Sequence, residues 1–463
     1  MENKKPENRF LENSTLTVAT LTSFLAPFMI SAVNVALPDI QADFAASAVM
    51  LSWISTAYLL STAVFLVPVG KIADIYGRKK YFSRGLMLLV LSSALSALAP
   101  SVLMLIAFRV LQGVGAAMII TTGMAILTSV FPPHRRGRAI GIYVAAVYVG
   151  LSVGPTAGGV MTQHFGWRSI FWAVVPLGIF SIIVTRTCLR GEWKGAPGDK
   201  FDLIGSLLYG PSLVALIYGA SLLPAPVAFL GVGLGVAGLI AFAVRQASVR
   251  YPVFDVCLFQ NNRVFAFSSL AALINYAATF AVTFLMSLYL QYVKGFPPQT
   301  AGFILVFQPV IMAALSPFAG RLSDRIEPRW IASCGMGLTA LGLLRLVFLG
   351  PETSTEAIIG ILCLLGLGFA LFSSPNMNAI MGAVEKKYFG IASGAVATMR
   401  LLGQMLSMAI ATVVFTLIMG SAQISVSNLP LFLKSAKIVF VIFTFLCAAG
   451  IYFSMARGRL RGE

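Results

Sequence analysis

Two short polar stretches decide how this chain folds: GKIADIYGRKK at residues 70–80 and GRLSDR at residues 320–325. Each stretch lies between two long apolar segments, and in each a glycine precedes an aspartate by four residues. A chain that is otherwise nearly all apolar has therefore built the same polar loop twice. The repeat predicts two related halves that move against each other within a membrane.

The composition indicates a membrane protein. Of the 463 residues, 58% are hydrophobic and 11% are charged, whereas soluble proteins carry about 25% charged residues. The apolar runs are long enough to cross a hydrocarbon core as helices, and they are too long and too uniform for the strands of a barrel. We therefore predict an all-α membrane protein with fourteen transmembrane helices, at about residues 15–37, 50–69, 81–99, 101–131, 137–162, 167–187, 202–223, 226–247, 264–292, 298–319, 329–349, 355–381, 388–418 and 431–456.

The net charge of +17 raises the question of a nucleic-acid partner. Most Lys and Arg residues, however, fall in the tails and in every second loop, including the loops at 78–84 and 135–138. This asymmetry is the positive-inside signal, and it predicts that both termini are cytoplasmic. We expect a multi-pass protein of the cytoplasmic membrane, in contact with the lipid bilayer and with no nucleic acid.

The polar loops follow the second and the tenth predicted span, which is the same place in two groups of six. We therefore expect three units: an N-terminal six-helix bundle (1–190), a two-helix insert with cytoplasmic connectors (191–262) and a C-terminal six-helix bundle (263–463). In proteins built from such repeats, substrate binds near the midplane between the bundles, and access alternates as they rock.

Two arginines lie deep in predicted spans. Arg109 is flanked by apolar residues in span 4, and a lone guanidinium there costs several kcal/mol unless it faces a polar cavity or finds acceptors. Gln112 is one turn away and Asn34 can face it across the bundle. Arg400, with Gln404 one turn on, is its counterpart in the second half. The alternative role for Arg109 is to brace the cavity through backbone carbonyls.

Span 5 is rich in glycine around a proline. Gly150, Gly154, Gly158 and Gly159 leave faces without side chains, where helices can approach and slide. Pro155 removes one backbone hydrogen bond and should kink the helix. Ordinary close packing is the alternative explanation for the glycines.

Further polar and aromatic residues inside spans are candidates for binding substrate. They could line an apolar pocket with a few polar groups, although packing or lipid contact is the alternative for each aromatic ring. These candidates are Tyr143, Asn275, Tyr276, Gln308, Asn376 and Asn378.

Four motifs occur in order along the chain, at residues 33–38, 70–80, 109–115 and 150–159. Together they resemble the signature motifs of the major facilitator superfamily, in particular its fourteen-span drug/proton antiporter branch. The resemblance implies the major facilitator fold, and the span-5 motif implies export. It also implies that Arg109 helps proton transfer or energy coupling. The same resemblance assigns a conformational latch to Gly70, Asp74, Gly77, Arg78, Gly320, Asp324 and Arg325.

One position departs from the branch. Met29 stands in span 1 where the branch usually has an aspartate, and no acidic residue lies in the middle of any predicted span. Buried carboxylates are the usual groups for binding protons or cationic cargo. We therefore expect neutral, zwitterionic or anionic cargo. Coupling would run through Asp39, Asp43 or Asp74, through Arg109, or through the cargo itself.

We predict a secondary active transporter that exports amphipathic small molecules, with protons as the coupling ion and the monomer as the working unit. The alternative is a dedicated metabolite carrier or a lipid-like flippase on the same scaffold, with weak or no proton coupling. An enzyme is disfavoured, because His134 and His164 fall on loops on opposite sides. No phosphate-binding loop of a primary pump occurs. The scattered cysteines give no metal or redox spacing, so we expect no cofactor and no metal.

Overall fold

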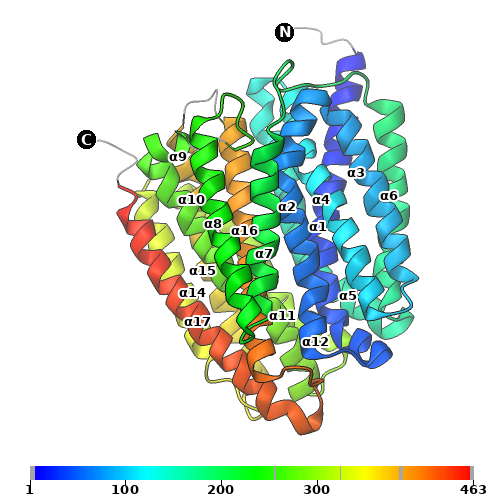
Figure 1. The fold of residues 1–463 in the computed structure, drawn as a ribbon, viewed down its shortest axis with the longest axis vertical. Helices are drawn as coiled ribbons and strands as arrows, with labels where there is room; N and C mark the ends of the chain where they lie inside the picture. The colour runs from blue at the N-terminus through cyan, green and yellow to red at the C-terminus, as the bar shows by residue number, and fades with distance from the viewer. Residues whose placement is uncertain (1–5, 255–256, 324, 385–388, 459–463) are drawn as a thin grey trace.

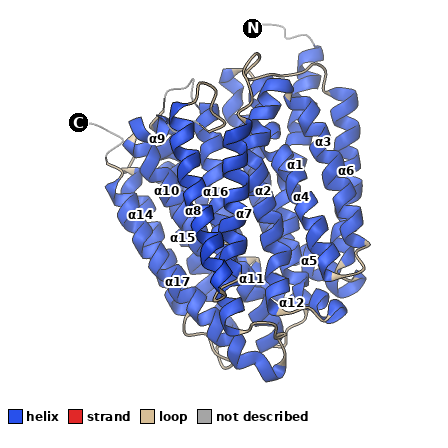
Figure 2. Ribbon diagram, viewed as in Figure 1, coloured by secondary structure: helices blue, strands red, loops and turns tan. Residues whose placement is uncertain are grey.

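The computed structural model describes residues 6–254, 257–323, 325–384 and 389–458. In this part of the chain every regular element is a helix, and the helices are joined by short loops (Figure 2). Most helices run roughly parallel to one another between two ends of the molecule (Figure 1). This arrangement satisfies the backbone within each helix, as an apolar surrounding requires.

The first six helices pack together, and we call them the N bundle. Within it α1 contacts α4, α5 and α6, while α4 also contacts α2 and α3, and α3 contacts α6. The helices are α1 (Pro6–Phe44), α2 (Ala48–Tyr76), α3 (Arg78–Ala97), α4 (Val102–Val130), α5 (Pro133–Phe165) and α6 (Arg168–Cys188).

The second half repeats this packing order, and we call it the C bundle. Here α10 contacts α15, α16 and α17, α15 also contacts α13 and α14, and α14 contacts α17. The repeat of the polar loops in the sequence thus corresponds to a repeat of helix packing. The elements are α10 (Arg263–Thr279), α11 (Ala281–Leu288), η1 (Tyr289–Val293), α12 (Pro298–Leu305), α13 (Phe307–Ser323), α14 (Pro328–Leu346), α15 (Thr355–Gly382), α16 (Phe389–Ile418), η3 (Val426–Asn428) and α17 (Leu429–Ala456).

Two helices between the bundles form an insert. α7 (Leu203–Ser221) and α8 (Pro226–Ser248) pack against each other, and the short α9 (Cys257–Asn261) leads into α10. α7 contacts α2 of the N bundle and also α16 of the C bundle, and Figure 1 shows it running between them. The insert therefore touches both halves of the molecule.

Twelve helices of the described chain are long and apolar enough to cross a membrane by length and composition. α3 and α14, which correspond to the predicted spans at 81–99 and 329–349, fall outside this set. The two occupy equivalent places in the two bundles. Each begins directly after a polar loop, and α3 carries Arg78, Lys79, Lys80 and Arg84 in its first two turns. These charges lower the hydropathy of the helix without removing it from the bundle.

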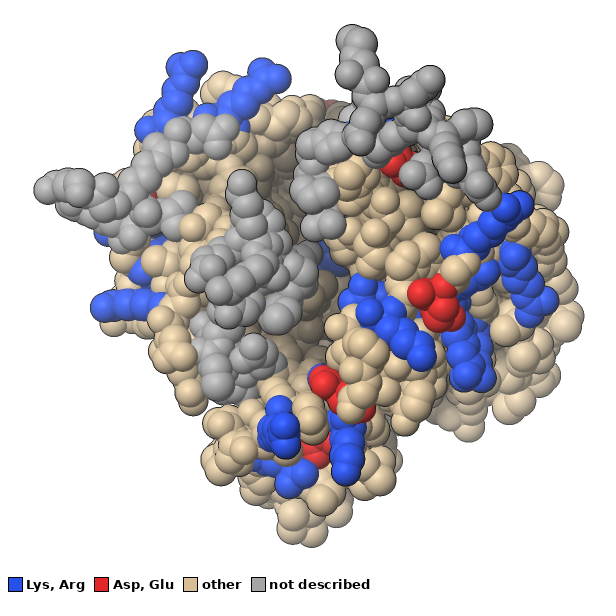
Figure 3. Space-filling view, turned by 90° about the horizontal axis from the view of Figure 1, so that it is seen from above, with Lys and Arg blue, Asp and Glu red and all other residues tan. Residues whose placement is uncertain are grey.

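The first turn of α1 and the last turn of α17 lie at the same end of the molecule, which we call the terminal face (Figure 1). Hydrogen bonds join the bundles toward the other end, the opposite face: Gln41 donates to the carbonyl of Ile424 (2.8 Å), and the hydroxyls of Thr56 and Thr412 are 3.2 Å apart. Seen from the terminal face, the molecule is hollowed between its lobes (Figure 3). The structure is thus closed at the opposite face and open at the terminal face.

The first two spans of the C bundle are broken, unlike α1 and α2. A break at Phe280 separates α10 from α11, and one at Val306 separates α12 from α13. At the first break the backbone N–H of Ala281 donates to Ser407 Oγ of α16 (2.9 Å), so a neighbouring helix satisfies a group that has left the helical ladder. On the side of the breaks toward the opposite face, α11 contacts α1 of the N bundle, and α12 contacts α5; α13 also contacts α5.

The insert is held at the terminal face by one carboxylate. Asp202 caps α7 by accepting from the N–H of Gly205 (3.0 Å), and it accepts from Arg245 (2.8 Å) and Gln246 (2.8 Å) at the end of α8. Burial pushes the pKa of Asp202 up, but the hydrogen bonds from Arg245, Gly205 and Gln246 outweigh burial and leave the pKa below its ordinary value. The ionised form therefore ties the two ends of the insert together.

We expect Asp202→Asn to lower the stability of the protein at pH 7 by about 1–2 kcal/mol, because asparagine still caps α7 but the hydrogen bonds to Arg245 and Gln246 lose their charged acceptor. Because the folded pKa is depressed, the contribution is full above the unfolded value of about 3.9 and is lost as pH falls through the folded pKa. Thermal unfolding in detergent should thus show a gap between wild type and variant that closes below about pH 4. Glu352→Gln, on an exposed loop, is the control; equal stability at pH 7 would contradict the role of Asp202.

Candidate functional site

Residues 70–80 are predicted as a loop, but in the structure only Gly77 is not helical: residues 70–76 end α2 and residues 78–80 begin α3 at the terminal face. We call this junction the first latch loop. Arg78 Nε donates to Asp74 Oδ1 (2.6 Å), and Arg78 Nη1 donates to Ser129 Oγ near the end of α4 (2.9 Å). Gly77 separates the two helices with a φ of 126°, a conformation that glycine adopts without strain. In this structure the Asp74–Arg78 pair is therefore made within the N bundle.

The second polar stretch, residues 320–325, begins with the last turn of α13 (residues 320–323) and lies before α14 at the same face. Asp324 lies outside the described residues, whereas Gly320 is half-buried and Arg325 is exposed. Asn378 of α15 donates to Ser323 Oγ (2.6 Å) and so braces the loop. The two loops share a face, as the sequence predicts, but the ion pair of the first has no described equivalent in the second.

Arg109 is fully buried within the N bundle. Its Nε donates to the carbonyl of Ile54 (3.1 Å), its Nη1 donates to Gln112 Oε1 (2.5 Å), and its guanidinium lies 4.3 Å from the ring centre of Tyr58. Gln112 in turn donates to Ser93 Oγ (2.7 Å). Arg109 Nη2 and the Tyr58 hydroxyl are both buried without a partner. The charge is thus solvated by neutral groups and an aromatic face, and two polar atoms beside it remain unpaired.

Asn34 lies elsewhere in the N bundle network. Its Oδ1 accepts from Ser55 Oγ of α2 (2.8 Å), and its side chain is buried. The hydrogen bonds of Arg109 run to α2 and along α4, and Asn34 accepts its hydrogen bond from α2. Both residues therefore anchor α2 from different sides.

Arg400 belongs to a second polar cluster, at mid-depth between the bundles. Arg400 on α16 is half-buried, and it lies near enough to Tyr276 on α10 and Tyr143 on α5 for its charge to act on both hydroxyls. The Tyr148 hydroxyl of α5 is 3.1 Å from Ser373 Oγ of α15. We call Tyr143, Tyr148, Tyr276, Ser373 and Arg400 the tyrosine–arginine cluster. It draws side chains from both bundles, which is the arrangement that a site between two moving halves needs.

The glycines of α5 divide between two neighbours. A Cβ on Gly154 would lie 2.5 Å from Ser31 Cβ, and one on Gly158 would lie 2.7 Å from Ala32 Cα, so these residues seat α5 on α1. Gly150 does the same against Phe24. Gly159 instead faces α12 of the other bundle, where a Cβ would collide with the carbonyl of Pro298.

The contact is reciprocal, because a Cβ on Gly302 of α12 would collide with the carbonyl of Pro155. We call this crossing of α5 and α12 near the opposite face the glycine seam, formed by Gly159 and Gly302. Backbone meets backbone there with no side chain between them. The seam closes the opposite face in this structure.

The family described as the Major Facilitator Superfamily matches residues 19–238 and 268–461, which is most of the chain. The chain belongs to this superfamily. It is therefore a multi-pass membrane transporter and not an enzyme. The part between the two matched segments, residues 239–267, covers the second half of α8 and the connector to α10.

Two curated relatives are bacterial transporters. The chain is 33% identical to multidrug resistance protein Stp of Mycobacterium tuberculosis over 411 residues, covering 86% of this chain and 75% of that protein. It is 29% identical to riboflavin transporter RibZ of Clostridioides difficile over 388 residues, covering 83% and 84%. One relative is thus named for drug resistance and the other for a vitamin.

Among solved structures, the transporter is similar to a bacterial homologue of the human lysosomal transporter Spinster in an inward-facing and unoccupied conformation. The TM-score is 0.67, the identity is 17%, and the match covers 98% of each chain. At this identity the likeness shows the fold alone.

The amides singled out in the sequence have different surroundings in the transporter. Asn376 is buried and both ends of its amide are engaged, since it donates to the carbonyl of Ser268 (3.1 Å) and accepts from Arg457 (2.9 Å). Asn378 braces the second polar loop, as described above. Neither amide is open to cargo in this structure, because each is occupied within the C bundle.

The other three candidate amides lie on α10, α13 and α16. Asn275 is fully buried on α10, and its Nδ2 and Oδ1 have no partner. Gln308 of α13 and Gln404 of α16 are half-buried. An unpaired buried amide is costly, so Asn275 remains a candidate for contact with a ligand or a water.

Arg457 is a site residue that the sequence does not reveal. It follows α17, where it looks like one more tail arginine, yet it is 1% exposed. It donates to the carbonyl and hydroxyl of Ser454 (2.7 and 2.5 Å), to Asn376 and to Ser268 Oγ (3.2 Å). It thereby fastens the last turn of α17 to α10 and α15. The only sequence signal is the serine one turn before it.

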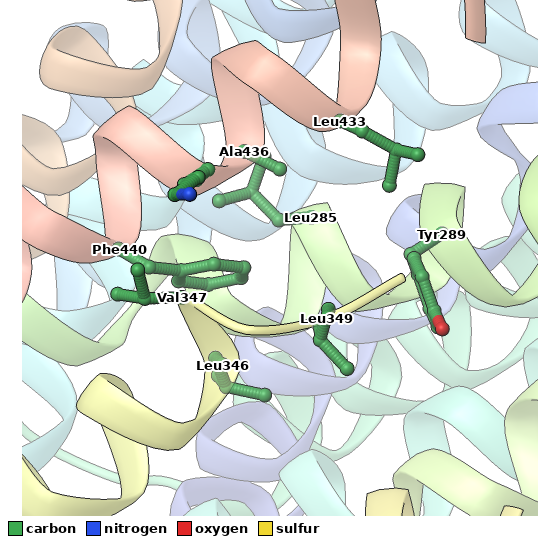
Figure 4. Close-up of a pocket in the computed structure, with 9 residues that line it drawn as sticks. Leu285, Tyr289, Leu346, Val347, Leu349, Leu433, Ala436 and Phe440 are labelled. Carbon is green, nitrogen blue, oxygen red and sulfur yellow. The ribbon is translucent and has the colours of Figure 1, made fainter. Parts of the chain in front are cut away.

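A small pocket lies inside the C bundle, away from the tyrosine–arginine cluster. Figure 4 shows it between α11, α14 and α17, lined mainly by apolar side chains such as Leu285, Leu346 and Phe440. Its walls come from one bundle alone. A transport path must run between the bundles, so we do not assign cargo binding to this pocket.

Proposed function

We propose that the protein is a secondary active exporter of amphipathic small molecules, of the fourteen-span drug/proton antiporter type, that works by alternating access. In this proposal α3 and α14 also cross the membrane, and the units at 1–190, 191–262 and 263–463 are the two bundles and the insert. The alternating direction of consecutive helices and the repeated packing order support fourteen crossings.

The proposal also places the terminal face in the cytoplasm. The basic residues at 78–84 and Arg457, directly after α17, lie on this side of the chain, and positive residues favour the cytoplasmic side. The structure then corresponds to an inward-open state. Cargo would enter from the cytoplasm through the hollow of Figure 3 and reach the tyrosine–arginine cluster.

The tyrosine–arginine cluster is the observation that carries the proposal. Tyrosines from α5 and α10 lie within the range of the charge of Arg400 on α16, and Phe369 packs edge-on against Tyr276 with ring centres 5.3 Å apart. Aromatic faces suit flat apolar bodies, and a guanidinium suits a carboxylate, sulfonate or enolate. We therefore propose aromatic amphiphiles, neutral or anionic, as the cargo class.

The two curated relatives differ in the range of cargo that their names indicate, and this range has to be tested. Similarity to Stp favours a multidrug exporter, and similarity to RibZ favours a carrier for one metabolite. The name of RibZ refers to riboflavin, a flat aromatic molecule with hydroxyl groups. Riboflavin therefore falls within the proposed cargo class. A single-metabolite carrier is thus the second candidate, and mutual competition among unrelated cargos separates the two.

Proton coupling is part of the proposal, and Arg109 is the residue we assign to it. Met29 is buried in the N bundle core where the branch has an acid, and Arg109 is surrounded by uncharged groups: the carbonyl of Ile54, the amide of Gln112 and the ring of Tyr58. A guanidinium does not release its proton in the physiological range. Arg109 would therefore set the field for a proton carried by water, by cargo or by a nearby tyrosine.

We expect Arg400→Gln to cut export of an anionic dye, 8-anilinonaphthalene-1-sulfonate, by about tenfold or more, because a hydrogen bond to a charged group is worth about 1.5–3 kcal/mol. Transport of neutral riboflavin should change far less. Proteoliposomes with an imposed pH gradient give both fluxes, and Arg400→Lys should keep part of the anionic flux.

Arg345→Gln, an exposed arginine near the opposite end of α14, is the matched control and should leave both fluxes unchanged. Fluxes that occur only in the presence of the pH gradient would support proton coupling. Export of cationic ethidium at the rate of the anionic dye, with equal loss of both in Arg400→Gln, would overturn the proposed cargo class.

A further inference from the structure

The connector between α6 and α7 lies on the first latch loop. We call residues 189–200 the strap; it leaves the end of α6 and leads directly into the cap of α7. It contains Glu192, Trp193, Gly195 and Asp199, all of them exposed or half-buried. A connector of this composition would ordinarily be free in solvent. Here it makes an ordered set of hydrogen bonds.

The strap satisfies the first three backbone amides of α3. Gly77, at the N-cap position, offers no side chain to cap the helix. Instead the N–H of Arg78 donates to the carbonyl of Trp193 (2.8 Å), and the N–H groups of Lys79 and Lys80 donate to the two carboxylate oxygens of Glu192 (2.7 and 3.2 Å). These amides have no partner within their own helix. Glu192 thus caps α3 from a distant part of the chain, with its negative charge at the positive end of the helix dipole.

The second half of the strap holds the other end of the latch loop. The N–H groups of Gly195 and Ala196 both donate to the carbonyl of Asp74 (3.0 and 3.1 Å). Lys71 Nζ donates to Asp199 Oδ2 (2.6 Å). The strap therefore grips the end of α2 and the start of α3 together, on either side of the Asp74–Arg78 pair.

Gly77 makes this grip possible. A Cβ at this position would lie 2.5 Å from the carboxylate carbon of Glu192, and its φ of 126° already excludes most other residues. The glycine thus has a second requirement besides turn geometry, because it leaves room for the carboxylate. Gly77 and Glu192 are far apart in the sequence, but the absence of a side chain at Gly77 leaves the space that the Glu192 carboxylate fills.

The strap also connects the latch loop to the relative position of the bundles. Through Asp202 it enters α7, and α7 contacts α2 in one bundle and α16 in the other. When the bundles rock, α7 cannot keep both contacts unchanged. The displacement must be absorbed by the strap, which is fixed at its far end by Glu192.

We propose that the strap stabilises the state in which the opposite face is closed, and that Glu192 is the positioning residue that sets the balance between this state and the alternate one. Glu192 acts through the α3 amides and does not contact cargo. The inference rests on the proposed alternating-access cycle. Loss of the Glu192 contacts would release the strap and allow α7 to move with α16 of the C bundle, which shifts the population toward opening of the opposite face.

A cysteine in the closed interface reports the balance directly. Thr412 is 1% exposed where α16 meets α2, so Thr412→Cys reacts with a maleimide only when the opposite face opens. In a variant whose five native cysteines are replaced by serine, we expect Glu192→Ala to raise the labelling rate about tenfold, the population shift that loss of a helix cap of about 1.4 kcal/mol produces. Glu192→Gln keeps one acceptor oxygen, so its labelling rate should lie between those of the protein with Glu192 and of Glu192→Ala.

Asp199→Asn is the second variant, because it loosens the strap at its other end without touching α3; it should raise labelling less than Glu192→Ala. Glu352→Ala, on a loop of the opposite face, should leave labelling unchanged. A purely structural role would lower the thermal midpoint of Glu192→Ala and leave labelling as it was, and that result would overturn the proposal. Labelling needs no cargo, so failure of the exporter assignment would show as absent transport with the labelling difference still present.

Discussion

Replacing Gly159 by alanine will slow transport by about ten- to hundredfold, because overpacking costs about 1–3 kcal/mol and each 1.4 kcal/mol is a factor of ten. The added Cβ would meet the carbonyl of Pro298 and lie 3.0 Å from Gln299 Cα. Both obstacles are backbone and cannot rotate away. The bundles can relieve the collision only by separating, so the state closed at the opposite face becomes less populated. Gly302→Ala, on the other side of the glycine seam, should act in the same direction. Uptake by proteoliposomes measures the loss.

Gly141→Ala is the matched control in the same helix, since a Cβ there meets nothing within 4 Å. Gly158→Ala gives the contrast, because its Cβ would collide with Ala32 inside the N bundle. That variant should lower the thermal midpoint, whereas Gly159→Ala should keep it close to wild type. Transport by Gly159→Ala at the wild-type rate would show that the seam does not need backbone contact.

Replacing Arg109 by methionine will reduce coupled transport by about a hundredfold, equivalent to about 2.7 kcal/mol, without lowering stability. Burying a charge with no counter-ion costs several kcal/mol, and apolar replacements of similar volume are often neutral or stabilising. The loss of hydrogen bonds to Ile54 and Gln112 offsets part of this gain. Arg109 therefore costs stability, and its Nη2 is buried without a hydrogen-bond partner. Its presence is explained by a role in transport and not by a contribution to folding.

Arg109→Lys separates charge from shape, because an ammonium cannot bind Ile54 and Gln112 while stacking on Tyr58. We expect it to transport poorly as well. Arg84→Met, an exposed arginine that lies over Tyr81 on α3, is the control and should change little. A marked fall in the thermal midpoint of Arg109→Met, with transport lost in proportion to folded protein, would support the alternative role of Arg109 as a brace.

Several features could be predicted from the sequence because they depend on local patterns. Gly70 and Gly320 mark two polar loops at equivalent places, and the structure puts these loops on one face of an all-helical protein. Gly154 and Gly158 recur at helical spacing, and they seat α5 against α1. Arg109, isolated among apolar residues, had to find acceptors in the bundle, and it did.

Other features could not be predicted because two distant residues decide them together. Nothing in the local sequence distinguishes Gly159 from Gly158. In the structure, however, Gly159 faces the C bundle and Gly158 faces α1. The sequence around Asn376 is as apolar as that expected around a pocket residue, but the amide oxygen of Asn376 accepts a hydrogen bond from Arg457. The break at Phe280 depends on Ser407 of α16, more than a hundred residues away.

The sequence by itself determined that this is a helical membrane protein of two related halves with a polar loop repeated in each. Periodicity, charge and hydropathy are properties of a segment, and a segment displays them without its neighbours. Only the tertiary structure decided which face of the protein is closed, which arginine meets the tyrosines, and that Glu192 caps α3. Those outcomes depend on which unpaired amide or charge finds a partner elsewhere in the chain, since a buried polar group is satisfied by position in space and not by position in sequence.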